Sequence, residues 1–350
     1  MNKIINKSIK IAIVGATGLV GQSFLKVLEE FDLPIDEYKL FASKKNAGKI
    51  IKFLNKDYQI NELTEKSFDE KFDFALFSAG SNISEKFAPI AASKNCIVID
   101  NSSFWRMKKN IPLVIPQVNP QDLENHSNII SNPNCSTIQA ACVLHPIHQK
   151  YKIKRIIFST YQAVSGAGKS GYNDLKNGIN SYVNNTEYKL EKFLYPIFNN
   201  CIPQIDDFLE NNYTKEEQKM IDETKKILHE PNLAISATTV RVPVFNSHSE
   251  SINIELSTEF KINDIKSLLD ISPGVVVHDD PSKNKYPMAV DCSGKNEVFV
   301  GRIRRDFSIK NGLNLWVVSD NIRKGAATNA VEILAYLLTG NIYNKKTLLF

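Results

Sequence analysis

The fold is decided by the stretch Gly15-Ala16-Thr17-Gly18-Leu19-Val20-Gly21. It directly follows a short run rich in β-branched residues, Ile9–Val14, and its three glycines recur at every third position. This is the G-x-x-G-x-x-G form of the dinucleotide-binding fingerprint, in which glycines let backbone N–H groups approach a pyrophosphate at a helix N-terminus. The sequence therefore predicts that the chain opens with a nucleotide-binding strand–loop–helix unit.

Strands and helices alternate beyond this loop. Further runs with strand character are Tyr38–Ala42, Phe72–Phe77 and Cys96–Asp100, and helical spacing is found at Gln22–Phe31 and Ser84–Ser93. Alternation of this kind is typical of parallel βαβ units. We expect an α/β fold that begins with a Rossmann-like parallel sheet.

From about Tyr151 the strands become longer and alternate between apolar and polar residues, which indicates a mixed or antiparallel sheet. These strands are Lys154–Gln162, Leu233–Val240, Ser251–Leu256, Glu297–Ile303 and Leu313–Val318, with helices at Tyr172–Val183, Lys215–Leu228 and Ile262–Leu269. The apolar helix Ala326–Leu338 is expected to pack back onto the first domain. We therefore predict a discontinuous domain of residues 1–134 plus 322–350, and an α+β domain of residues 135–321.

Bulk composition excludes several classes of protein. The chain has 350 residues, 43% of them hydrophobic, which is enough for two cores. Its net charge of +5 is spread among acids, so a nucleic-acid partner is not expected. No apolar run is long enough to span a membrane, and the glycines break the weak resemblance of the N-terminus to a secretory signal. The five cysteines form no CxxC pair, which indicates reduced thiols in a cytoplasmic protein.

The segment after the second strand distinguishes the two nicotinamide cofactors. An NAD site needs a carboxylate there for the ribose hydroxyl. The chain instead has Ser43, Lys44, Lys45 and Asn46, without an acid. Two cations and two hydrogen-bonding side chains suit a 2′-phosphate, so NADP is favoured. The alternative is an ordinary solvated basic loop.

A candidate nucleophile lies further along, in the segment Ser131-Asn132-Pro133-Asn134-Cys135-Ser136-Thr137. Cys135 follows a proline-containing turn and precedes an apolar run, residues 138–144, with helical character. A thiol at a helix N-terminus is favoured as thiolate by the helix dipole and by unpaired backbone N–H groups. Covalent chemistry at a carbonyl is the functional interpretation, and a buried inert thiol is the alternative.

A second glycine-containing loop, residues 163–170, resembles a phosphate-binding P-loop, but its first position is Ala163 instead of glycine. The preceding strand alternates as a half-exposed strand would. We therefore expect this loop to lie against the nicotinamide end of a dinucleotide.

Other polar groups allow more than one interpretation. His145 and His148 have helical spacing but no further ligands nearby, so no metal site is predicted. Arg241 lies shortly before His248 and would bind a carboxylate with its planar guanidinium, or else form a surface salt bridge. On spacing alone, Glu216 and Lys219 are an exposed ion pair on one helix face.

Taken together, the chain resembles the aspartate-semialdehyde dehydrogenases over nearly its whole length. The motifs that carry the resemblance are GATGLVG at 15–21, SSFWRM at 102–107, SNPNCST at 131–137, YQAVSGAG at 161–168, EEQK at 216–219, RVPVFNSHSE at 241–250 and SDNIRKGAA at 319–327. The sibling acetylglutamyl-phosphate reductases carry NPGCYPT-like residues around the cysteine. SNPNCST therefore points to the aspartate-semialdehyde branch.

The resemblance implies NADP-dependent reductive dephosphorylation of L-4-aspartyl phosphate to L-aspartate 4-semialdehyde through a cysteine thioester, in lysine, threonine and methionine biosynthesis. It implies that residues 135–321 form a catalytic and dimerisation domain, that the partners are a small-molecule substrate and inorganic phosphate, and that the enzyme is a homodimer, with a tetramer as the alternative. Neither a membrane nor a nucleic acid is an expected partner.

The same resemblance assigns the site residues. Cys135 would be the nucleophile, His248 an acid–base group of near-neutral pKa, and Gln162 a substrate-positioning residue. Substrate binding would fall to Arg241 and Glu216, and phosphate binding to Arg106 and Lys219. Contacts to NADP would come from Gly15, Thr17, Gly18, Leu19, Val20, Gly21, Ser43, Lys45, Asn46, Ser165, Gly166 and Asn321.

Three positions depart from the usual pattern of the family. Lys45-Asn46 stands where Arg-Ser is common, which loses a bidentate guanidinium. Ser247 replaces a small Gly or Ala before the histidine, and Gln117 replaces a common Glu. Two alternatives remain: a related acyl-phosphate or acyl-CoA reductase such as N-acetyl-γ-glutamyl-phosphate reductase, and a non-catalytic NADP-binding sensor.

Overall fold

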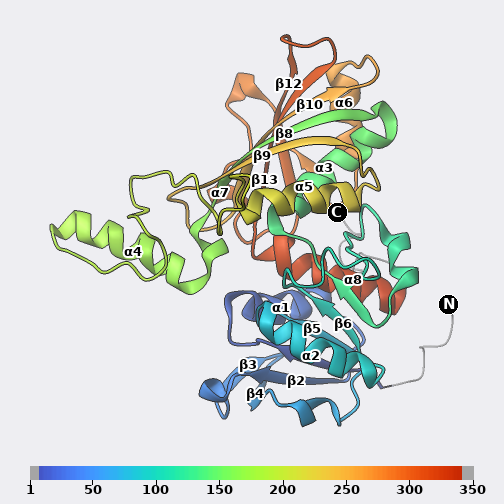
Figure 1. Ribbon diagram of the computed structural model, residues 1–350, viewed down its shortest axis with the longest axis vertical. Helices are drawn as coiled ribbons and strands as arrows, with labels where there is room; N and C mark the ends of the chain where they lie inside the picture. Colours follow the sequence, from blue (N-terminus) through green and yellow to red (C-terminus); the bar gives the residue numbers. More distant parts are fainter. Residues whose placement is uncertain (1–7, 341–350) are drawn as a thin grey trace. The chain divides into compact units, whose positions relative to one another are not determined.

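The computed structural model describes residues 8–340 (Figure 1). The chain divides into two compact units, residues 1–133 with 326–350, and residues 134–325. The predicted domain division stays a prediction. The units differ from it by placing Asn134 and residues 322–325 in the second unit. Residues 1–7 and 341–350, which the predicted first domain includes, lie outside the described residues.

Within residues 8–340, the first unit holds a seven-stranded sheet in the order β3-β4-β2-β1-β5-β6-β7. The strands are β1 Lys10–Val14, β2 Glu37–Ala42, β3 Ile50–Phe53, β4 Lys56–Glu62, β5 Phe74–Phe77, β6 Ile97–Asp100 and β7 Ile129–Ser131. All their pairings are parallel except the β3–β4 hairpin. The predicted Rossmann-like parallel sheet is confirmed.

The central strand β1 is buried on both faces of the sheet. Ile11 and Ile13 share one core with the helices α1 (Leu19–Phe31) and α8 (Asn329–Thr339). Ala12 and Val14 belong to a second core with α2 (Ser81–Ser93). Successive residues of a strand point to opposite faces, so a strand covered on both sides is a continuous apolar run. This is why β1 is recognisable in the sequence.

The closing helix packs in the first unit, as predicted. It begins at Asn329 instead of Ala326, because the preceding residues, Arg323–Thr328, wind as a π-helix. The wider turn is visible in the hydrogen bond that the N–H of Gly325 donates to the carbonyl of Asp320, 3.0 Å away. Such π-turns are frequent at functional sites.

The second unit holds, within the described residues, a six-stranded sheet in the order β11-β12-β13-β10-β8-β9. The strands are β8 Ile153–Gln162, β9 Ala234–Arg241, β10 His248–Leu256, β11 Val275–Val277, β12 Val298–Asp306 and β13 Gly312–Ser319. The pairs β8–β9 and β11–β12 are parallel and the others are antiparallel. The expectation of a mixed sheet is confirmed.

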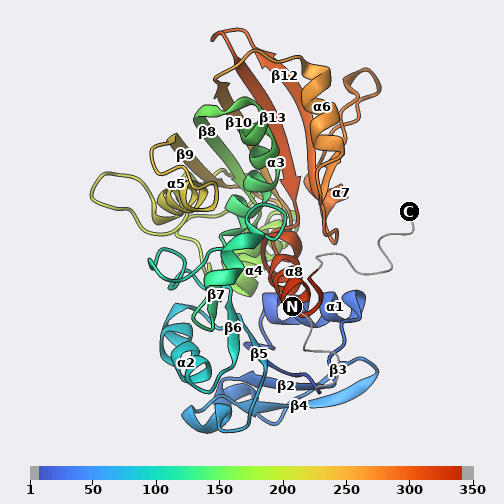
Figure 2. The same cartoon turned by 90° about the vertical axis from the view of Figure 1, so that its right-hand side faces the viewer.

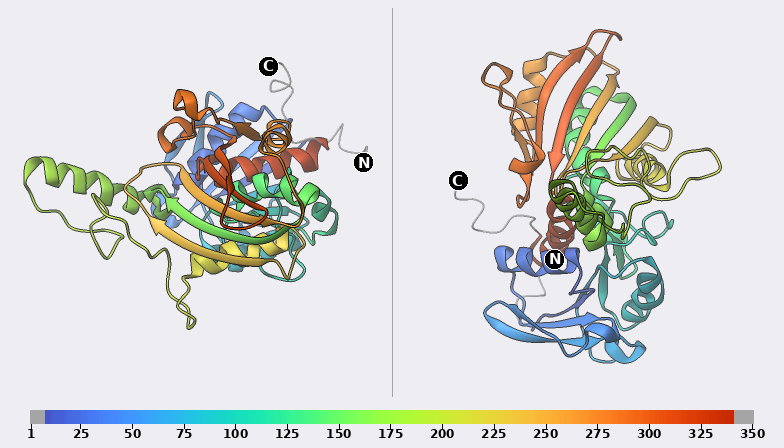
Figure 3. Two further views of the ribbon diagram at one scale, coloured as in Figure 1. Left: turned by 90° about the horizontal axis from the view of Figure 1, so that it is seen from above. Right: turned by 90° about the vertical axis from the view of Figure 1, so that its left-hand side faces the viewer.

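Helices cover one face of the second sheet. Figure 2 shows α3 (Cys135–Tyr151) and α6 (Ile262–Asp270) in front of the strands, and α5 (Lys215–Ile227) packs on β9. Ile252, Ile254 and Leu313 are fully buried. The other face of the strands is turned toward the viewer on the right of Figure 3.

The remaining helical segments are short, apart from α4. They are α4 Gly168–Asn184, α7 Ala289–Cys292 and the 3-10 turns η1 Lys44–Asn46, η2 Glu65–Phe68, η3 Pro120–Asn125, η4 Val164–Ala167 and η5 Pro281–Lys283. In the part of the chain that the structure describes, no helix combines the length and the apolarity needed to cross a bilayer.

Candidate active site

Most of the predicted catalytic residues meet at one end of the second sheet. Gln162 ends β8, Arg241 ends β9, and the two lie opposite each other in the parallel register. His248 begins β10, which runs antiparallel to β8, so its side chain starts from the same end. The topology of the sheet therefore brings together three residues that are far apart in the sequence.

Cys135 is the first residue of α3 and is partly exposed. The preceding Asn134 caps the helix, because its Oδ1 accepts hydrogen bonds from the N–H groups of Ser136 (3.0 Å) and Thr137 (3.4 Å). A Cβ on Gly325 would lie 2.7 Å from the Cβ of Cys135, so only glycine fits there. The predicted helix N-terminal position of the thiol is confirmed.

His248 is fully buried, and its Nδ1 accepts a hydrogen bond from the backbone N–H of Ala163 at 3.0 Å. In the neutral ring, the proton must then reside on Nε2. Burial, and secondarily the charge of Arg241, lower the pKa of His248 well below its usual 6.5. The near-neutral pKa expected for His248 is therefore wrong, because a ring with a pKa below 6.5 is neutral at pH 7. Its acid–base role stays a prediction.

The Nε2 atom of His248 is itself buried and has no hydrogen-bond partner among residues 8–340. Buried polar groups without partners are rare and call for an explanation. Nε2 lies 3.2 Å from the place where a Cβ on Gly166 would stand. A side chain at Gly166 would therefore crowd both the ring and the guanidinium of Arg241, so glycine lets this exposed loop lie close to them.

Arg241 is 5% exposed, which excludes the alternative of a surface salt bridge. Its Nη1 donates to the carbonyl oxygen of Ala163 at 2.7 Å. Burial lowers the pKa of Arg241, while the nearby charges of Glu216 and Cys135 raise it. Because the ordinary pKa of arginine lies far above neutral pH, the guanidinium remains a cation beside Cys135.

Glu216 lies in the first turn of α5 and is buried, so its interpretation as half of an exposed ion pair is wrong. Its Oε1 accepts from the side-chain amides of Asn134 (2.9 Å) and Gln162 (3.3 Å). Its Oε2 lies 3.3 Å from Nζ of Lys219, which also pairs with Asp206 at 2.8 Å. The carboxylate is therefore linked to the residue that caps the cysteine helix.

The loop after β8 belongs to the same site. The side chains of Ser165 and Asn321 are buried and hydrogen-bond each other, at 3.0 and 3.1 Å. Oδ1 of Asn321 also accepts the N–H of Ser247 at 3.0 Å. Ser247 has a φ of +71°, a backbone conformation that favours glycine.

The glycine loop of the first unit borders a cavity of about 310 Å³, lined by Val14, Gly15, Thr17, Gly18, Ala42, Ser43, Leu63, Ser78, Ala79, Ile83 and Phe87. A Cβ on Gly15 would come 2.6 Å from the carbonyl oxygen of Ser78, and one on Gly21 would come 2.1 Å from that of Gly15. The helix α1 starts at Leu19, and Gly18 provides no side-chain cap. Its first N–H groups therefore suit an anion.

The basic segment after β2 forms the turn η1 beside this loop. Nδ2 of Asn46 donates to Oγ1 of Thr17 at 3.2 Å, and Oδ1 of Asn46 accepts from Nζ of Lys49 at 2.6 Å. Lys45 is exposed. Lys49 thus adds a third cation to this segment. The sequence does not single out Lys49, although its position three residues after Asn46 places it close to the turn.

Arg106, also predicted for phosphate binding, belongs to the first unit, whereas Lys219 belongs to the second. The side chain of Arg106 is buried, and its Nη2 donates to the carbonyl of Asn101 at 2.9 Å. The predicted roles of both residues stay predictions.

His148, the second residue of the helical histidine pair, has a structural role. Nε2 of His148 lies 3.0 Å from Glu230, and Nδ1 accepts the N–H of Ile153 at 3.2 Å, so both ring nitrogens are used. No group of three or more His, Cys, Asp or Glu side chains placed to hold a metal occurs within residues 8–340.

Sequence patterns missed two contributors to the site. Ala163 holds His248 with its N–H and Arg241 with its carbonyl, and a backbone role leaves no mark on residue type. Glu223 accepts the N–H of Asn134 at 2.6 Å. Its place on α5, two helical turns after Glu216, is a weak signal at best.

Comparisons with known proteins agree with this geometry. The family model described as "Semialdehyde dehydrogenase, NAD binding domain" matches residues 10–126, and "Semialdehyde dehydrogenase, dimerisation domain" matches residues 144–324. The aspartate-semialdehyde dehydrogenase of Aquifex aeolicus is 50% identical, over 94% of this chain and 98% of its own length. That of Bacillus subtilis is 47% identical, over 96% and 99%.

Solved structures give the same result. The aspartate semialdehyde dehydrogenase II of Vibrio cholerae, complexed with ASA, superposes with a TM-score of 0.92 at 43% identity, covering 95% of this chain and 98% of that one. The Candida albicans enzyme with NADP has a TM-score of 0.75 at 25% identity, covering 96% and 100%.

Proposed function

Because this chain belongs to the aspartate-semialdehyde dehydrogenase family, we propose that it reduces L-4-aspartyl phosphate to L-aspartate 4-semialdehyde with NADPH, through a thioester on Cys135. The supporting observation is the meeting of Cys135, His248, Arg241 and Gln162 at one end of the second sheet. The reaction belongs to lysine, threonine and methionine biosynthesis.

Cys135 is the nucleophile in this proposal. The N-terminus of α3 and the Arg241 cation both favour its thiolate. The sulfur attacks the acyl carbon of the substrate, the C–O bond to phosphate breaks, and inorganic phosphate leaves with the bonding electrons. A thioester remains, and it is a better hydride acceptor than a carboxylate.

His248 acts as the donor to the substrate oxygen. Its Nε2–H stabilises the negative charge that develops on the acyl oxygen during both additions. Bound NADPH would supply the hydride that reduces the thioester carbon. When the resulting oxyanion collapses, the C–S bond breaks and the aldehyde and the Cys135 thiolate form, so the step needs no net proton from the ring.

Substrate recognition uses the charged groups around the cysteine. Arg241 has donors beyond the Nη1 that Ala163 occupies, and its planar fork suits the α-carboxylate. Glu216 offers carboxylate oxygens to the α-amino group, and Gln162 positions the acyl group. Lys219 and Arg106 are assigned to the phosphate. The Glu216 contacts to Asn134 and Gln162 hold these groups together.

The first unit fits the dinucleotide. A side chain at Gly15 or Gly21 would collide with backbone atoms, so the tight winding of the loop depends on glycine, which supports this assignment. Thr17, Gly18, Leu19 and Val20 would hold the pyrophosphate; Ser43, Lys45 and Asn46 would hold the 2′-phosphate. Ser165, Gly166 and Asn321 of the second unit are assigned to the nicotinamide side.

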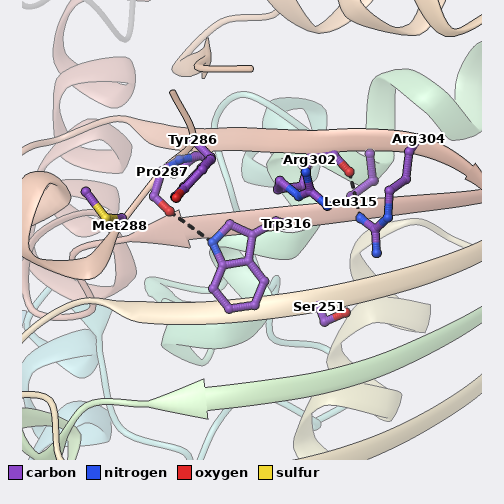
Figure 4. A pocket seen from close by; sticks show the side chains of 8 residues that line it. All are labelled: Ser251, Tyr286, Pro287, Met288, Arg302, Arg304, Leu315 and Trp316. Carbon is purple, nitrogen blue, oxygen red and sulfur yellow. Dashed lines mark hydrogen bonds between the residues drawn. The ribbon is translucent and has the colours of Figure 1, made fainter. Parts of the chain in front are cut away.

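The family model for dimerisation covers residues 144–324, which supports a homodimer. The second sheet carries a pocket of about 500 Å³, lined by Ser251, Tyr286, Pro287, Met288, Arg302, Arg304, Leu315 and Trp316 (Figure 4). Trp316 donates to the carbonyl of Pro287 at 3.0 Å, and its ring contacts the tilted ring of Tyr161, which is 42% exposed. This face suits a second copy. Light scattering should give twice the chain mass of 39.5 kDa.

A reverse assay tests the proposed activity. With L-aspartate 4-semialdehyde and NADP, a rise in NADPH absorbance should require added phosphate. Cys135→Ala should abolish the rise while NADPH still binds. A preference for N-acetylglutamate semialdehyde would show instead that the enzyme has the activity of the related acyl-phosphate reductases. Full activity of the variant would overturn the mechanism, and binding without turnover in the wild type would favour a sensor.

We also propose a cytoplasmic location, where such biosynthesis draws on NADPH.

A further inference from the structure

Glu250 is a fully buried acid that the mechanism does not use. It follows His248 by two residues on β10, so both side chains project from the same face of the sheet. Neither carboxyl oxygen has a hydrogen-bond partner of ordinary geometry within residues 8–340. Burying an unpaired carboxylate is strongly unfavourable. The residue therefore needs a physical explanation.

The groups around Glu250 are polar but uncharged. Ser136 and Gln139, one helical turn apart on α3, face its carboxyl and affect its pKa. On the neighbouring strands, Thr160 of β8 and Val317 of β13 lie opposite Glu250. No cation contributes to its pKa, so nothing in the described residues compensates a negative charge there.

Hydrogen-bond donors and acceptors around Glu250 do not balance if it is ionised. Nε2 of Gln139 donates to the carbonyl oxygen of His248 at 3.4 Å, but its Oε1 is buried without a donor. Ser136 accepts from Gln162 at 3.0 Å, which leaves its own hydroxyl proton to donate. The hydroxyl of Ser136 and the second N–H of Gln139 can donate to Glu250, which leaves Oε1 of Gln139 without a donor, and a proton on Glu250 supplies it. Burial accordingly raises the pKa of Glu250 well above 4.5, and the lowering by Ser136 and Gln139 is smaller.

We propose that Glu250 is a positioning residue which, as a neutral carboxylic acid, donates to Oε1 of Gln139 and accepts from the hydroxyl of Ser136. This arrangement joins the first turn of the helix that carries Cys135 to the strand that carries His248. The consequence for catalysis rests on the proposed function. Neutrality also avoids adding a third carboxylate to Glu216 and Glu223 near the N-terminus of the helix that carries Cys135.

Two substitutions distinguish the neutral hydrogen-bonding role of Glu250 from simple filling of space by its side chain. Glu250→Gln keeps the size, a donor and an acceptor, so it should retain kcat close to that of the wild type. Glu250→Leu keeps the volume but not the hydrogen bonds, and it should lower kcat by roughly 10- to 100-fold, as expected when reacting groups shift by about 1 Å. KM should change less, because Arg241 and Glu216 are untouched.

Glu255 offers a matched control on the same strand. It is paired with Lys154 at 3.7 Å near the surface, and Glu255→Gln and Glu255→Leu should leave kcat unchanged. Wild-type activity of Glu250→Leu, or equal damage in Glu250→Gln and Glu250→Leu, would overturn the proposal.

Infrared spectroscopy tests the neutral acid without any assay of turnover. The difference spectrum between the wild-type enzyme and Glu250→Gln at pH 7 should contain the C=O stretch of a protonated carboxylic acid. Carboxylate stretches in this difference spectrum, instead of the C=O stretch of the protonated acid, would overturn the proposal. This test does not depend on whether Glu250→Leu folds. If the wild type shows the protonated acid but no dehydrogenase activity, the proposed function fails while the state of Glu250 stands.

Discussion

The backbone N–H of Ala163 donates to Nδ1 of His248 at 3.0 Å. This bond places the proton of the neutral imidazole on Nε2, the nitrogen beside Gly166. The carbonyl of Ala163 accepts from Arg241 at 2.7 Å. A residue without a functional side chain therefore sets both the tautomer of the donor and the place of the guanidinium.

Asn134→Asp should make Cys135 less reactive. The variant retains oxygens to cap α3 but loses the amide that donates to Glu216 at 2.9 Å, and it adds a second acid beside that carboxylate. Negative charge at the helix N-terminus disfavours the thiolate. Alkylation of Cys135 by iodoacetamide at pH 7 should slow by roughly tenfold, equal to about 1.4 kcal/mol. Asn173→Asp, which loses a similar amide–carboxylate contact on the surface, is the control and should react as the wild type.

Ser247→Gly should stabilise the protein. A non-glycine residue at positive φ costs about 1–2 kcal/mol, which glycine would relieve in the folded protein. The greater freedom of glycine in the unfolded chain offsets about 0.5–1 kcal/mol of this stabilisation. The free energy of unfolding in urea should therefore rise by about 0.5–1 kcal/mol. Ser249→Gly, in the extended strand β10, should lower it. A loss of stability in Ser247→Gly would show that the left-handed backbone is not strained.

Gly21→Ala should lower the stability of the protein, whereas Gly18→Ala should not. The new Cβ would lie 2.1 Å from the carbonyl oxygen of Gly15 in the first variant and 3.4 Å in the second. Overpacking of this kind costs roughly 1–3 kcal/mol, so Gly21→Ala should lower the thermal midpoint and weaken NADPH binding. Gly18→Ala should keep the midpoint. Equal midpoints would contradict the packing described for the loop.

Glu250→Gln should become more stable than the wild type as the pH rises. Folded Glu250 keeps a proton that the unfolded chain releases above about pH 4.5, so the wild type loses stability with increasing pH from there until the raised pKa is passed. The glutamine lacks this loss. The difference in unfolding free energy should grow by at most about 1.4 kcal/mol per pH unit. His248 titrates in both proteins and cancels in the difference. A difference that does not change with pH would mean that Glu250 is ionised when folded.

Much of the fold could be predicted because its apolar runs and glycines have single explanations. The β3–β4 hairpin was missed, since its turn uses Leu54 and Asn55 at positive φ instead of glycine. The late start of α8 was also missed, because Ala326 and Ala327 of the π-turn continue the apolar pattern of the helix.

The site was less accessible than the fold. The position of Cys135 followed from local pattern, because a helix start is a local property. Arg241 and Gln162 were grouped with it only through the family resemblance, since strand pairing is a long-range property. The burial of Glu216 depends on how α5 packs on β9, which its charged sequence does not reveal. The low basicity of His248 likewise arises from tertiary burial.

The most direct test is to trap the acyl-enzyme. Wild-type protein mixed with L-4-aspartyl phosphate in the absence of NADPH should release phosphate and gain the mass of one aspartyl group. Peptide mapping should place that group on Cys135, and hydroxylamine should remove it. Turnover with NADPH but no adduct on Cys135, or an adduct that persists in Cys135→Ser at another residue, would contradict a thioester at this cysteine.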